Sequence, residues 1–382
     1  MLSRLCRAIA RAPRFEQDLK SVQESMERNL NTINDDGNYT KERVLRVIRS
    51  YYFLSSDSSK LQERKNWGRD TMVQESIHKL LPLVNQLEPD AINLLIINLG
   101  LLNVYNPSIW REIENQFVEI SHKYLPTSSI VRVCESFRIA RRKNQEVWAI
   151  INEKFLNEIY SAGQLEGQDA ARTFKNLSIV KEGSPELIAK LKENIRGSLE
   201  QLNSRALFNV IEGLANSSTH DQEFENMIIS FTIESISKVE SPSYGNILYY
   251  VSRIGNHQML DRIESLVLPH IEDESILQLS RAIYNYGSEG FLNNPQRKKF
   301  AETVSKYFNE NKQAISKKFT NTSVFSVAEA KFIYVAFKLN TGFTDEDILT
   351  AYKNSDDSER TTQVVQAMRS EFEIYLKEKN LI

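Results

Sequence analysis

The sequence predicts an all-α fold, specifically an α-solenoid of helix pairs of about 37–40 residues with helical caps at both ends. Glycine and proline are scarce, at 13 and 9 of 382 residues, which disfavours folds that need many tight turns. The hydrophobic content of 41% is enough for a large core. One apolar pattern recurs along most of the chain at a nearly constant spacing, which is typical of repeat proteins.

The first fifteen residues, MLSRLCRAIARAPRF, predict a basic amphipathic helix. Arg4, Arg7 and Arg11 share one side of this helix, Arg14 follows, and the first acidic residue is Glu16. This pattern is typical of a mitochondrial transit peptide. The alternatives are an ordinary surface helix and a basic arm that touches nucleic acid or lipid. Removal of residues 1–15 would lower Lys+Arg from 48 to 44 against 50 acidic residues, moving the formal net charge from -2 to -6.

Residues 16–86 are expected to form an N-terminal helical cap region. The pattern predicts a polar helix over 16–38, a second helix over 39–55 and an exposed loop over 55–70.

Residues 87–310 are predicted to form the repeat array. Each copy places apolar residues at positions i, i+3, i+4 and i+7, which share one face of a helix. The copies begin 38, 40, 37, 37, 32 and 54 residues apart. They lie at 92–99, 130–137, 170–177, 207–214, 244–251 and 276–283, with a seventh at 330–337.

A polar turn and a second amphipathic helix follow each copy. The turns NVYNPS (103–108) and VKEGSP (180–185) end in residues that favour a helix start, with Pro107 and Pro185 near the first helical position. One helix pair cannot bury both of its apolar faces, whereas stacked pairs share a continuous core. An irregular helical bundle is the alternative.

Residues 311–382 are expected to form a C-terminal helical cap region. Helices are predicted near 345–353 and 358–379. The acidic run at 345–347 lies at a predicted helix start, where the helix dipole favours negative charge. Paired-carboxylate catalysis is therefore a poorer explanation of this run.

Three stretches carry a family resemblance: NLLIINLGLLN (93–103), ARTFKNLSIV (171–180) and RALFNVIEGLAN (205–216). Tandem helix pairs of this length behind a transit-like start resemble organellar helical-repeat proteins, the group that includes octotricopeptide, heptatricopeptide and FAST-kinase-like arrays. The resemblance covers residues 87–310. It implies a role in organellar RNA maturation or translation, or as a structural subunit of a large assembly. We find no RAP-type domain and no regular base-reading positions, which favours the structural role.

Motifs for catalysis or cofactor binding are missing from the sequence. Gly-rich phosphate loops, HExxH and a nucleophile elbow do not occur, and the five histidines are scattered. Cys6 and Cys134 lack metal-ligand spacing, and Cys134 is expected to be a small buried hydrophobe. We predict a protein that is not an enzyme and uses no cofactor. No apolar run reaches about 18 residues, so no transmembrane helix is expected.

The basic turn after the 130–137 copy is the first site of interest. Basic side chains gather here and at a second place far along the chain, and both are candidates for contact with RNA or a partner. Phosphate binding needs cations at equivalent positions of successive repeats, but position 138 corresponds to Gly100, Ser178 and Ala215. A solvated helix corner is the alternative. The candidates are Arg132, Arg138, Arg141, Arg142, Lys143, Arg297, Lys298 and Lys299.

Tyrosines in the fifth and sixth first helices give a further indication. Tyr249, Tyr250, Tyr284 and Tyr286 can belong to the core or can anchor protein partners. We therefore expect a non-catalytic scaffold within a mitochondrial assembly, in the matrix or on the matrix face of the inner membrane. Its partners would be other protein subunits of a complex such as the mitoribosome or ATP synthase. The alternative is a factor that binds rRNA or mRNA.

Overall fold

The computed structural model describes residues 71–382 except 164, 238–243, 318, 320–321 and 355–362. Throughout this part the chain is all helical and has no strand, which confirms the all-α prediction. The segments predicted at 1–15, 16–38, 39–55 and 55–70 lie outside the described residues. The chain divides into two compact units, Met1–Leu202 and Asn203–Ile382.

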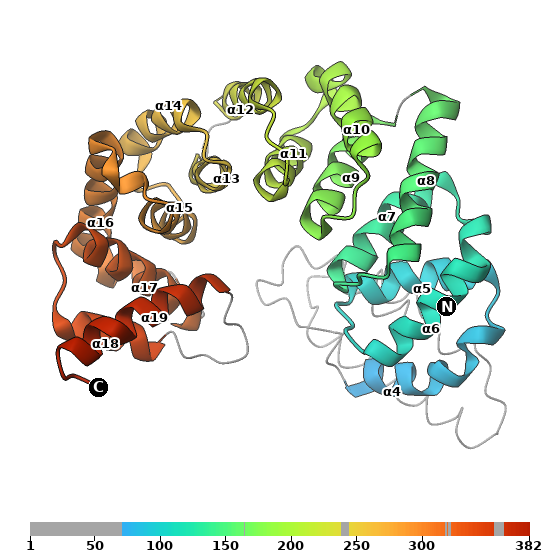
Figure 1. The fold of residues 1–382 in the computed structure, drawn as a ribbon, viewed down its shortest axis with the longest axis horizontal. Coiled ribbons are helices and arrows are strands. Elements are labelled where there is room, and N and C mark those ends of the chain that lie inside the picture. Colours follow the sequence, from blue (N-terminus) through green and yellow to red (C-terminus); the bar gives the residue numbers. More distant parts are fainter. Residues whose placement is uncertain (1–70, 164, 238–243, 318, 320–321, 355–362) are drawn as a thin grey trace, which may run out of the picture. The chain divides into compact units, whose positions relative to one another are not determined.

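The first unit contains three helix pairs after the short helices α4 (Thr71–Leu80) and η2 (Leu81–Gln86). Within it, α5, α7 and α9 pack on one another in chain order, and α6, α8 and α10 do the same (Figure 1). The pairs are α5 (Pro89–Leu101) with α6 (Pro107–Glu119), α7 (Thr127–Ile139) with α8 (Gln145–Ala162), and α9 (Gly167–Val180) with α10 (Pro185–Gly197).

The second unit repeats this two-layer arrangement. Its first helices α11, α13, α15 and α17 pack in chain order, and α12, α14 and α16 form the other layer. The helices are α11 (Ser204–Asn216), α12 (Gln222–Ile236), α13 (Gly245–Ile254), α14 (His257–Val267), α15 (Ile276–Ser288), α16 (Pro295–Ser316), α17 (Thr322–Leu339), α18 (Asp345–Asn354) and α19 (Gln363–Glu378).

The seven predicted copies coincide with the seven first helices from α5 to α17. Only Tyr244 falls outside, as the residue that precedes α13. The last step of 54 residues is long because α16 has 22 residues and α17 has 18. The predicted boundary at 310/311 falls inside α16, so no break in the helix marks it.

The second helices share a way of starting. In each of α6, α8, α10, α12, α14 and α16 a polar side chain just before the helix accepts a hydrogen bond from a backbone N–H of its first turn, which stabilises the helix start. Pro107 and Pro185 are the first residues of α6 and α10, as the sequence indicates. The capping residues are Asn106, Asn144, Ser184, Asp221, Asn256 and Asn294.

Close backbone packing joins α5 to α7. A Cβ atom added at Gly100 would lie 2.3 Å from the Cβ and 2.5 Å from the Cα of Ser136. The two helices can therefore approach this closely only because position 100 has no side chain. Beside this contact Phe137 is central to an aromatic cluster, with its ring centroid 5.3 Å from Phe117 and 5.7 Å from Trp110.

Candidate functional site

The basic turn at 138–143 forms the end of α7. The N–H of Arg142 donates to the carbonyl of Phe137 at 2.9 Å, and the N–H of Arg141 donates to the carbonyl of Arg138 at 3.0 Å. Arg141 has a φ of 55°, in the left-handed region. This geometry is a helix C-cap, in which the left-handed residue allows the last carbonyls of the helix to be hydrogen-bonded.

The side chain of Arg142 contacts the neighbouring helix α6. Its Nε donates to Glu114 Oε1 at 2.6 Å and its Nη2 donates to Glu114 Oε2 at 3.2 Å. Glu114 lies on α6 and its side chain is only 6% exposed, so the guanidinium neutralises a buried carboxylate. The carbonyl of Arg142 also accepts a hydrogen bond from Trp148 Nε1 at 3.0 Å. Arg142 therefore serves the packing of this repeat.

The same turn occurs one repeat earlier. Asn103 has a φ of 56°, and the N–H of Val104 donates to the carbonyl of Leu99 at 3.0 Å. The indole Nε1 of Trp110 donates to the carbonyl of Val104 at 2.7 Å. The contact of Trp148 with the carbonyl of Arg142 is the same contact 38 residues later. The backbone shape of the basic turn therefore does not depend on its basic residues, because the earlier repeat forms the same turn without them.

The other basic residues of the turn lie nearer the surface. Arg132, Arg141 and Lys143 are exposed. Arg138 is partly buried, and its Nη2 lies 3.8 Å from Glu135 Oε1. Arg138, Arg141, Arg142 and Lys143 lie at the C-terminal end of α7, whereas Arg132 lies about two turns earlier in the same helix. The second group, at 297–299, lies in the other unit.

Arg297 is buried, whereas Lys298 and Lys299 are exposed. The Nη2 atom of Arg297 donates to the carbonyl of His257 and to Asp261 Oδ1, both at 2.8 Å. These contacts join α16 to α14. Arg297 is therefore not positioned to contact RNA or a partner, contrary to its selection from the sequence as part of a basic triplet.

The tyrosines divide between core and surface. Tyr286 is fully buried and its hydroxyl donates to Glu264 Oε1 at 2.6 Å, so it belongs to the core. Tyr249 and Tyr250 are partly exposed on α13, with ring centroids 4.9 Å apart. Tyr284 on α15 is 4% exposed and packs on Tyr334 of α17, with centroids 5.1 Å apart.

Cations lie over these rings along α13, α15 and α17, a set that we call the tyrosine–cation face. Arg281 Cζ is 5.6 Å from the ring centroid of Tyr249 and Lys331 Nζ is 6.0 Å from that of Tyr284. A third cation, Lys338 Nζ, is 5.4 Å from the ring centroid of Tyr334. Sequence reasoning noticed the tyrosines and missed the cations.

Lys331 is the most unusual member of the tyrosine–cation face. It is 8% exposed, and burial together with the nearby positive charge of Arg281 lowers the pKa of Lys331 to about 8. Its position inside the apolar stretch AEAKFIYVAFKL (328–339) is the sequence signal that could have found it. A lysine is almost never buried unless it is paired.

The three cations differ in their partners. Lys338 Nζ forms an ion pair with Glu371 Oε2 at 2.6 Å, and Glu371 also accepts a hydrogen bond from the Tyr334 hydroxyl at 2.9 Å. In the part of the chain that the structure describes, neither Arg281 nor Lys331 has an ion-pair partner or a hydrogen-bond acceptor. Two neighbouring cations are therefore left without an anion.

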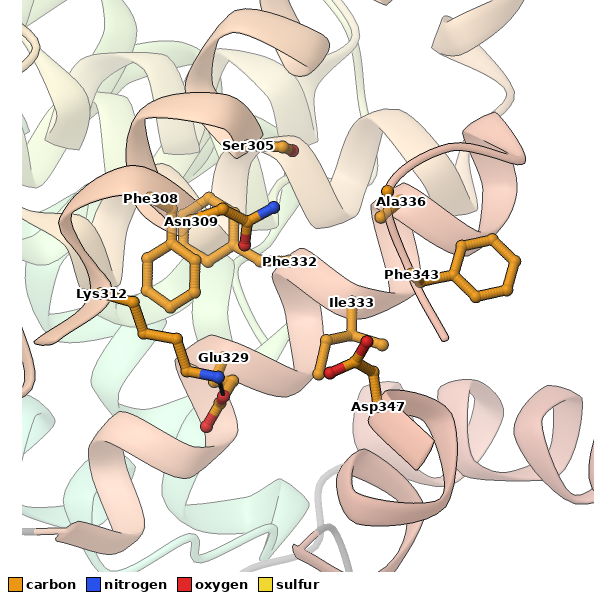
Figure 2. Close-up of a pocket in the computed structure, with 11 residues that line it drawn as sticks. Ser305, Phe308, Asn309, Lys312, Glu329, Phe332, Ile333, Ala336, Phe343 and Asp347 are labelled. Carbon is orange, nitrogen blue, oxygen red and sulfur yellow. Dashed lines mark ion pairs between the residues drawn. The ribbon is translucent and has the colours of Figure 1, made fainter. Parts of the chain in front are cut away.

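A small cavity lies between α16, α17 and the loop before α18 (Figure 2). The rings of Phe308 and Phe332 stack beside it with centroids 4.1 Å apart, and Lys312 pairs with Glu329 at its edge. Its volume of about 80 Å³ is well below the several hundred Å³ of typical small-molecule sites. This cavity is a packing gap in the second unit.

Metal-binding clusters and membrane-spanning helices are both absent from the described residues. No group of three or more His, Cys, Asp or Glu side chains is arranged to hold a metal ion there. No helix in that part of the chain is long and apolar enough to cross a membrane. Cys134 is fully buried, as predicted, and burial raises the pKa of its thiol.

No protein-family model matches the sequence, and no curated protein matches it.

Proposed function

We propose that the protein is a non-catalytic helical-repeat scaffold, an accessory structural subunit of a large mitochondrial assembly such as the mitoribosome or ATP synthase. The observation that carries this proposal is the packing of first helices in chain order within each unit. Repeats stacked in this way present long continuous surfaces on which several partners can dock. The mitochondrial assignment rests on the basic amphipathic pattern of residues 1–15.

The side-chain contacts favour the scaffold over an RNA-binding factor. Arg142 and Arg297, two of the eight basic candidates, are used to hold helices together. The formal net charge of -2 also makes the chain a poor general ligand for phosphate backbones. An RNA-binding factor remains the second candidate because Arg141 and Lys143 are exposed at the end of α7 and Arg132 is exposed on the same helix.

Gradient sedimentation of the tagged protein from gently solubilised mitochondria, with and without RNase, tests the proposal. We expect a heavy peak. A peak that persists after RNase indicates a protein assembly, and one that collapses indicates a ribosomal or other RNA-containing particle. Sedimentation as a monomer under both conditions, or absence from mitochondria, would contradict the scaffold proposal.

A further inference from the structure

We propose that Arg281 and Lys331 form a binding site for one carboxylate side chain of a protein partner, beside the partly exposed ring of Tyr249. This inference deepens the scaffold proposal by naming the chemistry of a partner. It starts from two cations on α15 and α17, which pack on each other. Arg281 lies one turn before Tyr284 on α15, Lys331 Nζ is 6.0 Å from the Tyr284 ring centroid, and neither cation has an anion among the described residues. Like charges held together are unfavourable, and a bound anion would relieve the repulsion.

Neither cation gives its N–H donors to an acceptor among the described residues. Arg281 lies over the ring of Tyr249 and Lys331 over the ring of Tyr284, and such contacts consume no hydrogen-bond acceptor. Arginine offers five N–H donors in a planar fork and lysine offers three. A carboxylate that enters between them can therefore accept charge-assisted hydrogen bonds from both side chains.

Nearby carboxylates indicate what kind of anion fits. Burial raises the pKa of Tyr284, and the negative charges of Glu371 and Glu289 raise it further. At the other end of the face, burial raises the pKa of Tyr250, and the negative charge of Glu212 raises it further. A polyphosphate chain passing along this face would meet these three negative charges, which favours a ligand that carries a single negative charge.

The aromatic content favours a protein partner as well. Tyr284 and Tyr334 are too deeply buried to act as stacking platforms for nucleic-acid bases, at 4% and 1% exposed. Tyrosine and arginine beside a small number of charged groups are typical of protein–protein interfaces. We therefore expect an acidic residue flanked by apolar residues in the partner.

The test is calorimetric titration of the full-length protein with two heptapeptides that carry one central Glu or Gln between leucines. We expect the Glu peptide to bind about tenfold more tightly than the Gln peptide. Lys331→Met and Arg281→Met should remove this difference, Lys331→Arg should retain most of it, and Lys353→Met, at an exposed site on α18, should leave it unchanged. Circular dichroism melts check that each variant is folded.

Three results would overturn the carboxylate site: equal affinity for both peptides, no binding of either, or a difference that survives in Lys331→Met. Tighter binding of a decauridine RNA that is lost in Lys331→Met would also overturn it, because the face would then be a phosphate site. The titration is independent of sedimentation. If the protein sediments in a heavy particle but binds both peptides equally, only the carboxylate-site proposal is wrong. If the protein sediments as a monomer but prefers the Glu peptide, only the scaffold proposal is wrong.

Discussion

At the scale of single residues, the basic side chains separate by their partners. Arg142 and Arg297 are bound to acceptors on neighbouring helices, so their charges hold the fold together. Arg281 and Lys331 lack such acceptors among the described residues, and their charges form no such link between helices. The position of a cation relative to carboxylates thus distinguishes structural from binding residues better than the density of positive charge in the sequence.

Arg142→Ala should lower the free energy of unfolding by about 2–4 kcal/mol, because it leaves the buried Glu114 carboxylate unpaired. Lys143→Ala is the matched control, since this exposed neighbour should change stability by less than about 0.5 kcal/mol. Denaturant unfolding monitored by circular dichroism measures both. Equal small effects of the two substitutions would contradict a structural role for Arg142.

Lys331→Met should raise the free energy of unfolding by about 1–3 kcal/mol at pH 7, because it removes a buried cation whose folded pKa is about 8. The ordinary lysine pKa is 10.5, so between these values the unfolded state binds more protons and the stability of the wild type rises with pH. The advantage of Lys331→Met should therefore shrink from pH 8 to pH 10.5.

Unfolding midpoints of both proteins across this range provide the measurement. Tyr250, Tyr284 and Tyr334 also have raised pKa values, so they ionise first in the unfolded state and lower the stability at the upper end of this range, but they are present in both proteins. Lys353→Met should show no such trend. A pH-independent difference between wild type and Lys331→Met would mean that Lys331 has an ordinary pKa.

At the scale of helices, the close approach of α5 and α7 at Gly100 sets the packing of the first two repeats. The equivalent turns at 103 and 141 share one backbone shape, with φ values of 56° and 55°. Only the local spacing of apolar residues, polar caps and prolines is visible in a sequence. The pairing of Glu114 with Arg142 depends on which repeats stack and in what register, so it could not be predicted.

Gly100→Ala should reduce the free energy of unfolding by about 1–3 kcal/mol, because the new methyl group would overlap both the Cα and the Cβ of Ser136. Gly197→Ala provides the control at the end of α10, where a Cβ atom meets nothing within 4 Å. This second substitution should be neutral or stabilise the protein by up to about 1 kcal/mol. Similar losses for both would contradict close packing at Gly100.

At the scale of the whole molecule, periodicity predicted the all-α fold and the positions of the seven first helices. The binding face was only partly visible, because Tyr249 and Tyr284 were recognised while Arg281 and Lys331 were not. These residues lie on three helices and meet only through packing. Their sequence separation conceals them from any search for clustered charge.

The capped second helices have a consequence for how the chain folds. Each capping residue acts on a backbone N–H only two or three positions away, and within each unit the first helices pack on one another in chain order. Contacts of this kind have low sequence separation, which favours rapid folding. A chain built in this way can acquire its structure progressively during synthesis, one helix pair after another, without waiting for its C-terminal end to emerge from the ribosome.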